Sequence, residues 1–366
     1  MWINKDSLAF VLSLTGIWKF SLSNSLIGNN QGGLFFFNPL SPYTSKVYLC
    51  HLCPLSFSPV GFCIYNSQTL DSCGRTSQTG EVYRYEDIHD VDVNHKEIII
   101  NGTKLIKFKT TRHAEIIYNL LGKLILTPIE RRHHFINENI IKLLNHQNAQ
   151  TTINDYEHQS AGLRTFTTIM FINLFFISPY LVWTLGLKQT IIPIAIFTYF
   201  LAILICVEFY HIHKYFYPSD NYDRICNISK MILCPPTAIG ANDILTSNLV
   251  SFYDPLAIAF IFFNKKRFEK FAEKIIRDLK YPIKINQFNE FSQIINWWYR
   301  LILIKSYLNH FKNNLAIEKD FFLAPEAMDI NCQSYCPRCL GQFIIYKGEC
   351  PDCDGVVLKS FHGYER

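Results

Sequence analysis

The sequence has little net charge and few charged residues. Its 366 residues include 35 basic and 30 acidic side chains, which give a formal net charge of +5, and charged residues make up 18% of the chain. Basic and acidic residues are interspersed, apart from the run Lys265-Lys266-Arg267. A nucleic-acid groove needs a concentrated basic patch, so nucleic acid is not expected as a partner. The mild positive charge favours an anionic membrane surface.

The usual sequence motifs of catalysis are also missing. The chain has no glycine-rich phosphate loop, no serine elbow and no recognisable set of nucleophile, base and orienting residue. No basic cluster marks a phosphoinositide pocket, and no small-molecule substrate is indicated. We therefore predict that the protein is not an enzyme, and we assign no catalytic or cofactor-binding residue.

Two long apolar runs contain no charged residue at all. Residues 165–187 and 190–207 are separated only by Lys188 and Gln189. Each run is long enough, or nearly so, to cross a hydrocarbon core of about 30 Å at about 1.5 Å per residue. The absence of charge from the middle of both runs argues against an ion pathway. We predict a transmembrane helical hairpin over residues 161–213.

Basic residues flank this hairpin on both outer sides, whereas its tip carries Lys188 alone. The flanking residues are Arg131, Arg132, Arg164, Lys214, Arg224 and Lys230. Positive residues are retained on the cytoplasmic side of a membrane. The sequence thus predicts an integral membrane protein, of the bacterial inner membrane, with both termini cytoplasmic and the lipid bilayer as one partner.

Twelve cysteines would suggest disulfides in a secreted protein, but their distribution favours a reducing cytoplasm. Four lie in paired knuckles and the others are scattered through apolar or helical segments. An apolar stretch at 7–18 has the length of a short signal sequence. It lacks a small-residue cleavage site, and Asp6 interrupts its basic start, so we expect it to be retained.

The knuckles are Cys336-Pro337-Arg338-Cys339 and Cys350-Pro351-Asp352-Cys353, separated by ten residues. Two C-x-x-C turns can bring four thiolates around one tetrahedral ion, so we predict a structural Zn²⁺ held by Cys336, Cys339, Cys350 and Cys353. The intervening 342–346, with a turn at 347–348, has the length of a β-hairpin, and 356–358 is a candidate third strand. This arrangement resembles a rubredoxin-like zinc ribbon. Zinc is favoured over iron because nothing beside the site suggests electron transfer.

The N-terminal third is predicted to be rich in β-strands. Candidate strands lie at 34–37, 61–65, 81–85 and 88–93. The clearest unit runs from 97 to 108 around Asn101-Gly102, a pair that tolerates the positive φ angles of a type I′ hairpin turn. An amphipathic helix at 111–124 should pack across this sheet.

Several antiparallel strands followed by one amphipathic helix are typical of the pleckstrin-homology and GRAM group, which this segment resembles. The residues that carry the resemblance are Gly61–Tyr65, Tyr85-Glu86-Asp87-Ile88, Phe108-Lys109-Thr110 and Ala114. The alternative is an unrelated small α+β domain. Members of such a group share a fold while differing in ligand, so the resemblance implies no lipid specificity.

Helices are predicted on either side of the hairpin. Thr127-Pro128-Ile129-Glu130 has the pattern of an N-cap followed by a first-turn proline, and it should start a helix to about residue 144. Polar residues 145–159 then approach the membrane. Four more helices are expected after the hairpin, at 220–233, 237–253, 254–279 and 293–311. The third could lie against the inner leaflet or pack within a helical domain.

Two further groups could bind metal but have simpler interpretations. Cys50-His51-Leu52-Cys53, with Cys63 and Cys73, could form a second metal site or be ordinary core cysteines. Glu208, His211 and His213 could be ligands or residues that cap and snorkel at the membrane interface. Neither group enters the predicted metal site.

These segments together predict a multidomain α+β membrane protein. Its predicted parts are a β-rich PH/GRAM-like domain at 1–126, an amphipathic linker helix at 127–160, the transmembrane hairpin at 161–213, a cytoplasmic helical region at 214–328 and the zinc ribbon at 329–366. Residues 217–220, 234–239, 254–257 and 277–279 resemble segments of uncharacterised bacterial two-span membrane proteins that carry a C-terminal zinc ribbon. The resemblance implies this architecture and no activity.

The leading functional hypothesis is a membrane-anchored cytoplasmic scaffold or adaptor. Its zinc ribbon and PH-like domain would bind a protein partner, such as a transporter or another membrane complex. The alternative is an enzyme, or an enzyme subunit, that works at the membrane surface on an unidentified reaction.

Overall fold

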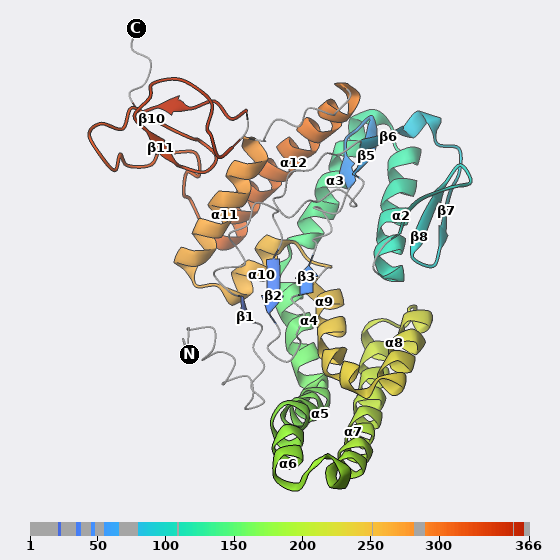
Figure 1. The fold of residues 1–366 in the computed structure, drawn as a ribbon. Helices are drawn as coiled ribbons and strands as arrows, with labels where there is room; N and C mark the ends of the chain where they lie inside the picture. The colour runs from blue at the N-terminus through green and yellow to red at the C-terminus, as the bar shows by residue number, and fades with distance from the viewer. Residues whose placement is uncertain are drawn as a thin grey trace.

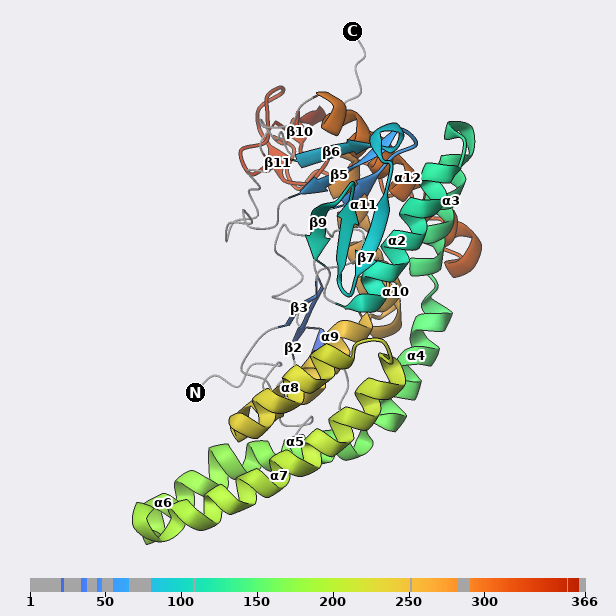
Figure 2. The same cartoon turned by 90° about the vertical axis from the view of Figure 1, so that its right-hand side faces the viewer.

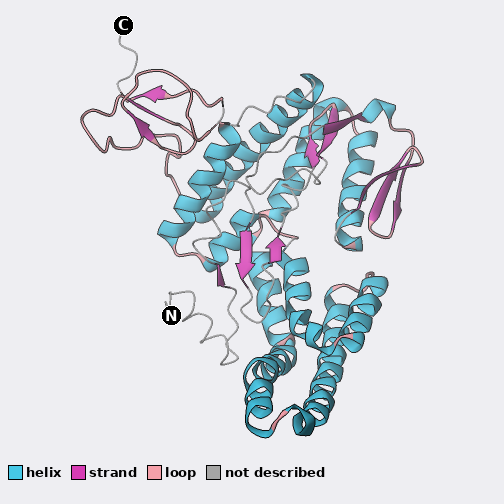
Figure 3. Ribbon diagram, viewed as in Figure 1, coloured by secondary structure: helices cyan, strands magenta, loops and turns pink. Residues whose placement is uncertain are grey.

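The computed structural model shows a mixed α+β fold that is mostly helical, with small antiparallel sheets (Figures 1 and 3). It describes residues 55–65, 80–107, 110–250, 252–281, 290–353 and 355–361, together with three short strands nearer the N-terminus. The predicted α+β class is confirmed in this form, whereas the division into named domains stays a prediction. The helical hairpin projects from one end of the molecule, and the cysteine-containing segment lies beside the helices at the other (Figure 1).

The first sheet contains β1 (Ser21–Leu22), β2 (Leu34–Phe37) and β3 (Ser45–Val47), in that order. The second contains β4 (Leu55–Phe57), β5 (Gly61–Tyr65) and β6 (Gly80–Arg84), all antiparallel. The strands predicted at 34–37 and 61–65 are therefore present with those bounds.

Ser58 stabilises the turn between β4 and β5, and Gly61 after it allows β5 to lie close to β6. The Ser58 side-chain oxygen accepts hydrogen bonds from the backbone N–H groups of Val60 and Gly61. A Cβ atom at Gly61 would lie 2.3 Å from the backbone oxygen of Tyr83, which is closer than packed atoms approach. Only glycine lets β5 lie this close to β6 at that position.

The third sheet contains β7 (Val91–Asn94), β8 (Glu97–Ile100) and β9 (Thr103–Lys107). The predicted Asn101-Gly102 turn is confirmed, because both residues have positive φ, at 48° and 75°. The Asn101 side chain also accepts hydrogen bonds from the N–H groups of His89 and Asp90. It therefore ties the hairpin to the preceding segment. The strand expected at 81–85 is β6 (Gly80–Arg84), followed by a short 3-10 turn, η2 (Tyr85–Asp87), and the strand expected at 88–93 begins only at Val91.

Helix α2 (Thr111–Leu126) packs against β7 and β8, as expected for the amphipathic helix after the sheet. Helices α3 (Ile129–Leu143) and α4 (His146–Gln159) follow. The predicted cap at Thr127 is wrong: Thr127 ends α2, and Pro128 takes the N-cap position of α3 without a side-chain hydrogen bond. The polar stretch expected to lead into the membrane is helix α4, whose Ile153 is buried.

The hairpin comprises α5 (Ala161–Ile172), a π-helical turn η3 (Asn173–Ile177), α6 (Ser178–Leu185) and α7 (Leu187–Phe216). Its two arms, 25 and 30 residues long, are long and apolar enough to cross a membrane. The reversal occurs at Gly186, with a φ of 85°, rather than at the expected Lys188 and Gln189. A buried hydrogen bond from Asn173 to Thr198 joins the arms.

Helices α8 (Asn221–Leu233), α9 (Ala241–Val250), α10 (Pro255–Phe262), α11 (Lys265–Lys280) and α12 (Glu290–Leu315) complete the body. The single helix expected at 254–279 is in fact α10 and α11, because the chain turns at Phe263 and Asn264. The helix expected from Thr237 begins as a 3-10 turn, η4 (Pro235–Gly240). Phe263, Phe268 and Phe271 are buried, so this segment packs within the helical body and not against a leaflet.

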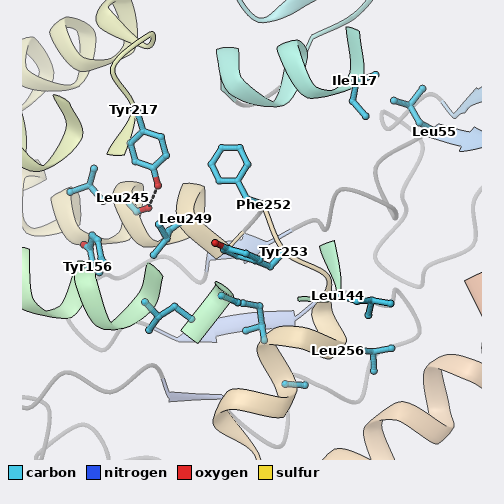
Figure 4. Packing of buried hydrophobic residues seen from close by; sticks show 14 of the residues in the cluster. Leu55, Ile117, Leu144, Tyr156, Tyr217, Leu245, Leu249, Phe252, Tyr253 and Leu256 are labelled. Carbon is cyan, nitrogen blue, oxygen red and sulfur yellow. Dashed lines mark hydrogen bonds between the residues drawn. The ribbon is translucent and has the colours of Figure 1, made fainter. Parts of the chain in front are cut away.

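One continuous hydrophobic core joins the strands β4 and β5, helices α2 to α5 and the helices after the hairpin. Figure 4 shows part of it, where Tyr217 donates a hydrogen bond to the Leu245 carbonyl and Phe252 lies near Leu249. Asp254 links three helices: it caps α10 through the N–H of Leu256, and its other oxygen accepts from Tyr307 of α12. Its own N–H donates to the Leu143 carbonyl at the end of α3. The predicted cap at Asp254-Pro255 is therefore present.

Candidate metal centre

The four predicted ligands come together in turns beside a small three-stranded sheet. It contains β10 (Ser334–Tyr335), β11 (Gln342–Phe343) and β12 (Lys359–Ser360), with β10 in the centre. The strands are only two residues each, so most of this segment is turns and loops. The predicted hairpin around residues 347–348 is not a pair of strands: β11 pairs with β10 across the first knuckle, and only an isolated bridge joins residues 349 and 357. The third strand lies at 359–360, after the predicted 356–358.

Backbone hydrogen bonds shape both knuckles. In the first, the N–H of Leu340 donates to the Cys336 carbonyl at 2.9 Å, and Leu340 takes a positive φ of 64°. In the second, the N–H of Cys353 donates to the Cys350 carbonyl at 3.2 Å, and Gly355 has a φ of 75°. Each turn folds the chain back so that its two sulfurs point to the same place.

The ligand atoms of Cys336, Cys339, Cys350 and Cys353 all lie within 4.8 Å of one another. The Sγ atoms of Cys339 and Cys350 are 3.7 Å apart. A tetrahedral ion with metal–sulfur bonds of about 2.3 Å would place neighbouring sulfurs about 3.8 Å apart. The donor set and its spacing therefore fit a four-coordinate metal ion, and the four cysteines could hold one. Among the described residues, no other group of this kind is found.

The contacts within the cluster favour protonated thiols at Cys339 and Cys353 unless a cation is bound. Burial and the neighbouring Cys336 sulfur together raise the pKa of Cys339 to about 11, although the backbone N–H of Gly341 acts to lower it. Burial and the nearby thiols also raise the pKa of Cys353. Burial acts to raise the pKa of Cys336 too, but backbone N–H groups outweigh it and leave that pKa below its ordinary value. Several thiolates can exist here together only with a positive ion among them.

A site with four thiolate ligands is closed. Three of the four cysteines are buried, and only Cys339 is exposed. Four protein ligands leave a tetrahedral ion no open position for water or substrate, so such a site stabilises structure and does not catalyse. A second small core supports it, where Val356 and Leu358 pack beside the cysteines.

The first knuckle is docked on helix α11. Arg277, which is 2% exposed, donates through Nη1 to the Pro337 carbonyl at 3.0 Å and through Nη2 to the Leu323 carbonyl at 2.8 Å. Arg338, which lies between Pro337 and Cys339 in the same knuckle, forms an ion pair with Asp278 at 3.0 Å. Burial raises the pKa of Asp278, and the Arg338 guanidinium opposes that effect. Local sequence patterns do not predict these two contacts, because the residues of each pair are about 60 positions apart.

The remaining candidates from the sequence do not join the cluster. Cys63 is buried in β5, whereas Cys50, Cys53 and Cys73 lie outside the described residues. Glu208 lies against Gly162 of α5, and a Cβ at that glycine would be 2.9 Å from its Oε1. His213 is buried while His211 is exposed, so the two histidines point in different directions.

Several apolar side chains are exposed on the outer part of the ribbon. Ile344, Ile345 and Tyr346 lie between β11 and the second knuckle, and Val357 follows that knuckle. Residues 349 and 357 form an antiparallel bridge, which places Val357 on the same hairpin. Clustered exposed apolar residues are typical of protein interaction sites.

Comparison with known proteins gave no relative. No family model, no curated protein and no solved structure matches this chain.

Proposed function

We propose that this protein is a membrane-anchored adaptor. The hairpin of α5 to α7 spans the bilayer, and the ribbon holds a structural Zn²⁺ through Cys336, Cys339, Cys350 and Cys353. The metal supplies folding free energy to a segment whose own core is small, and it takes part in no reaction. The ribbon then presents a rigid surface to a protein partner.

The observation that carries the proposal is the way the ribbon is mounted. Its first knuckle is fixed to α11 through Arg277 and Arg338, while the apolar residues Ile344, Ile345 and Val357 remain exposed. A module held rigidly on one side, with an apolar surface free on another, is suited to docking. The ribbon also lies far from the hairpin tip, so it can reach a partner away from the bilayer (Figure 1).

The orientation of the hairpin belongs to the same proposal. Basic residues flank the hairpin at its base, and we propose that the base and both termini are cytoplasmic, in a bacterial inner membrane. The aromatic residues Tyr180 and Trp183 near the tip are 61% and 83% exposed, as expected for side chains at the opposite membrane interface. The β-rich N-terminal part would supply a second binding surface, as its resemblance to the PH/GRAM group implies.

Site-specific photocrosslinking in intact cells tests the docking surface. A photoreactive residue placed at Ile344 or Val357 should give one discrete crosslinked protein. The matched control is Leu126 at the end of α2, an apolar residue that is 86% exposed but belongs to another part of the molecule. Equal crosslinking from all three positions, or none from the ribbon, would refute the docking surface.

The metal is tested on the detergent-purified chain. We expect one zinc per chain in the wild type and none in Cys336→Ser/Cys350→Ser. A preparation that is folded but contains no zinc, or a C-terminus that reacts with an external label in intact cells, would contradict the proposal.

A further inference from the structure

Helix α8 folds back along the membrane hairpin. A short loop after α7 reverses the chain, and α8 then packs beside α7 and runs toward the hairpin tip (Figure 2). The turn η4 at its far end packs against both α5 and α7. From sequence, this stretch belonged to the predicted cytoplasmic region, so its position beside the apolar helices calls for an explanation.

The outward face of α8 carries four large apolar side chains. Tyr222, Ile225, Ile232 and Leu233 are 74%, 63%, 49% and 81% exposed. They follow helical spacing along one side that also carries Ser229, and the exposed Asn221 and Lys230 lie at the edges of this face. The opposite side, with Arg224 and Met231, is buried against the protein. A helix in water would bury these apolar residues and expose Arg224, whereas here Arg224 is buried and the apolar residues are exposed.

A contact between α8 and α7 shows how far along the hairpin the outward face of α8 extends. The Arg224 guanidinium lies 5.1 Å from the centre of the Tyr210 ring, which aligns the two helices at that level. Leu233 is nine residues further along α8, a rise of about 14 Å toward the hairpin tip. The same distance along α7 reaches about Leu201, among lipid-facing residues such as Phe200 and Ile203, both more than half exposed. Leu233 therefore lies at the level of the exposed apolar side chains of α7.

The turn at the deep end of α8 leaves few unpaired polar groups. The Cys234 carbonyl accepts from the Thr237 N–H at 2.9 Å and from the Thr237 hydroxyl at 2.7 Å. The Lys230 carbonyl accepts from the Cys234 N–H. Pro235 and Pro236 have no N–H group that would need a partner. This is the condition that a lipid environment imposes on irregular backbone.

The other end of α8 is polar and is attached to the β-rich part. Asp220 accepts a hydrogen bond from the Thr111 N–H at the start of α2, at 2.7 Å. Asp223 forms an ion pair with Lys96 in the turn between β7 and β8. These contacts fix the polar end of α8 at the level where the hairpin leaves its apolar region.

We propose that α8 and η4 lie in the membrane leaflet nearest the ribbon, with Ile225, Ile232 and Leu233 against lipid acyl chains. The partner of this face is the hydrocarbon layer of the bilayer. Lys230, on the flank of α8, reaches back toward the headgroups. The inference rests on the proposed membrane hairpin and adds a third membrane-embedded segment, one that enters and leaves from the same side.

Thiol accessibility tests the proposal with the full chain in vesicles of phosphatidylcholine and phosphatidylglycerol. A charged, membrane-impermeant maleimide is supplied on both sides of the bilayer, and the labelling of each cysteine is measured by mass spectrometry. Native Cys234 reports on α8 and is exposed in the structure. Phe200→Cys reports on the hairpin, and Ile330→Cys, at a residue 98% exposed, reports on water.

We expect Ile330→Cys to be labelled at least tenfold faster than both Cys234 and Phe200→Cys. If Cys234 is labelled as fast as Ile330→Cys while Phe200→Cys is protected, the proposal for α8 is wrong and the hairpin stands. If Phe200→Cys is labelled as well, the membrane hairpin itself is wrong.

Charge substitution gives a second, independent test. Ile232→Asp/Leu233→Asp should lower the unfolding temperature of the vesicle-reconstituted chain by at least about 5 °C, because carboxylates are costly in lipid. The matched double variant Met328→Asp/Ile330→Asp, on apolar residues that are 87% and 98% exposed and belong to neither α8 nor the hairpin, should leave it unchanged. An unchanged unfolding temperature in the α8 variant would overturn the proposal.

Discussion

Arg277 of helix α11 donates a hydrogen bond to the carbonyl of Pro337, a residue inside the first cysteine knuckle, at 3.0 Å. Pro337 lies in the sequence between Cys336 and Cys339, two of the candidate metal ligands. Helix α11 therefore binds the backbone of the knuckle, while a metal ion would bind its two sulfur atoms. Arg277 is also paired with Glu273, which in turn binds Lys319 at 2.7 Å. The ribbon is thereby attached to the helical body at a place that is almost inaccessible to water.

Replacing Arg277 should detach the ribbon without destroying the metal site. Arg277→Ala leaves the buried Pro337 carbonyl and the partly buried Leu323 carbonyl without this donor, and leaves Glu273 with Lys319 alone, so we expect a loss of about 3–5 kcal/mol in stability at this interface. The measurement is limited proteolysis of the loop before the ribbon, together with the unfolding temperature and metal content. Lys319→Ala is the control, because Lys319 is 41% exposed and its ion pair with Glu273 should be worth less than about 1 kcal/mol. Equal effects of the two substitutions would contradict this account of the attachment.

Removal of the metal should unfold the ribbon and leave the rest of the chain folded. The ribbon core is a separate small cluster around the cysteines, whereas the continuous core elsewhere does not include them. A chelator should therefore make residues after about 325 sensitive to protease, while the helical content of α2 to α12 persists. Circular dichroism and mass spectrometry of the fragments would show this. Restoration by added zinc is expected, and a protease-resistant ribbon in the metal-free chain would refute the prediction.

Local features of this fold follow from local sequence. The Asn101-Gly102 turn and the two cysteine knuckles depend on residues within a few positions of one another, so they could be predicted. Contacts between distant segments could not. Nothing near Arg338 indicates that its partner is Asp278, and nothing in 254–279 marks the break at Phe263 and Asn264.

Burial is the other feature that the sequence leaves open. Helix α8 carries apolar residues on its outward face and Arg224 on its buried face, so periodicity alone predicts a helix but not which side faces the protein. The Thr127 cap failed for a related reason. Pro128 was expected at the first helical position but is the non-helical N-cap, with a ψ of 146°, because Thr127 belongs to the end of α2, which a pattern of four residues does not contain.

Gly61 should be irreplaceable in the strand it begins. Gly61→Ala would place a Cβ atom 2.3 Å from the Tyr83 oxygen, so β5 and β6 would have to separate. We expect a destabilisation of about 1–3 kcal/mol or more, measured as a lower unfolding temperature. Gly122→Ala provides the contrast, because nothing lies within 4 Å of a Cβ at that position in α2. That substitution should stabilise the helix by about 0.5–1 kcal/mol. A harmless Gly61→Ala variant would show that the two strands are not packed as closely as described.

The stability of the helical body should depend on pH through His310. This residue of α12 is 9% exposed, and its ring packs against that of His146 from α4, with centroids 5.7 Å apart. The Asn314 amide donates to its Nδ1 at 2.9 Å, which suits a neutral ring. Burial, with a smaller effect of His146, lowers the pKa of His310 from 6.5 to about 4.

The sign of the effect follows from the two pKa values. Between pH 6.5 and pH 4 the unfolded chain binds a proton at this histidine and the folded chain does not, so stability falls as the pH is lowered through that range. The loss can reach about 3 kcal/mol. His310→Leu cannot bind the proton, so its denaturant midpoint should fall less than that of the wild type between pH 7 and pH 4.5. Both chains carry the same cysteine site, and the difference between their profiles therefore isolates the histidine. Parallel profiles would show that His310 is protonated equally in the folded and unfolded states, and that the packing of α4 on α12 does not exclude its charge.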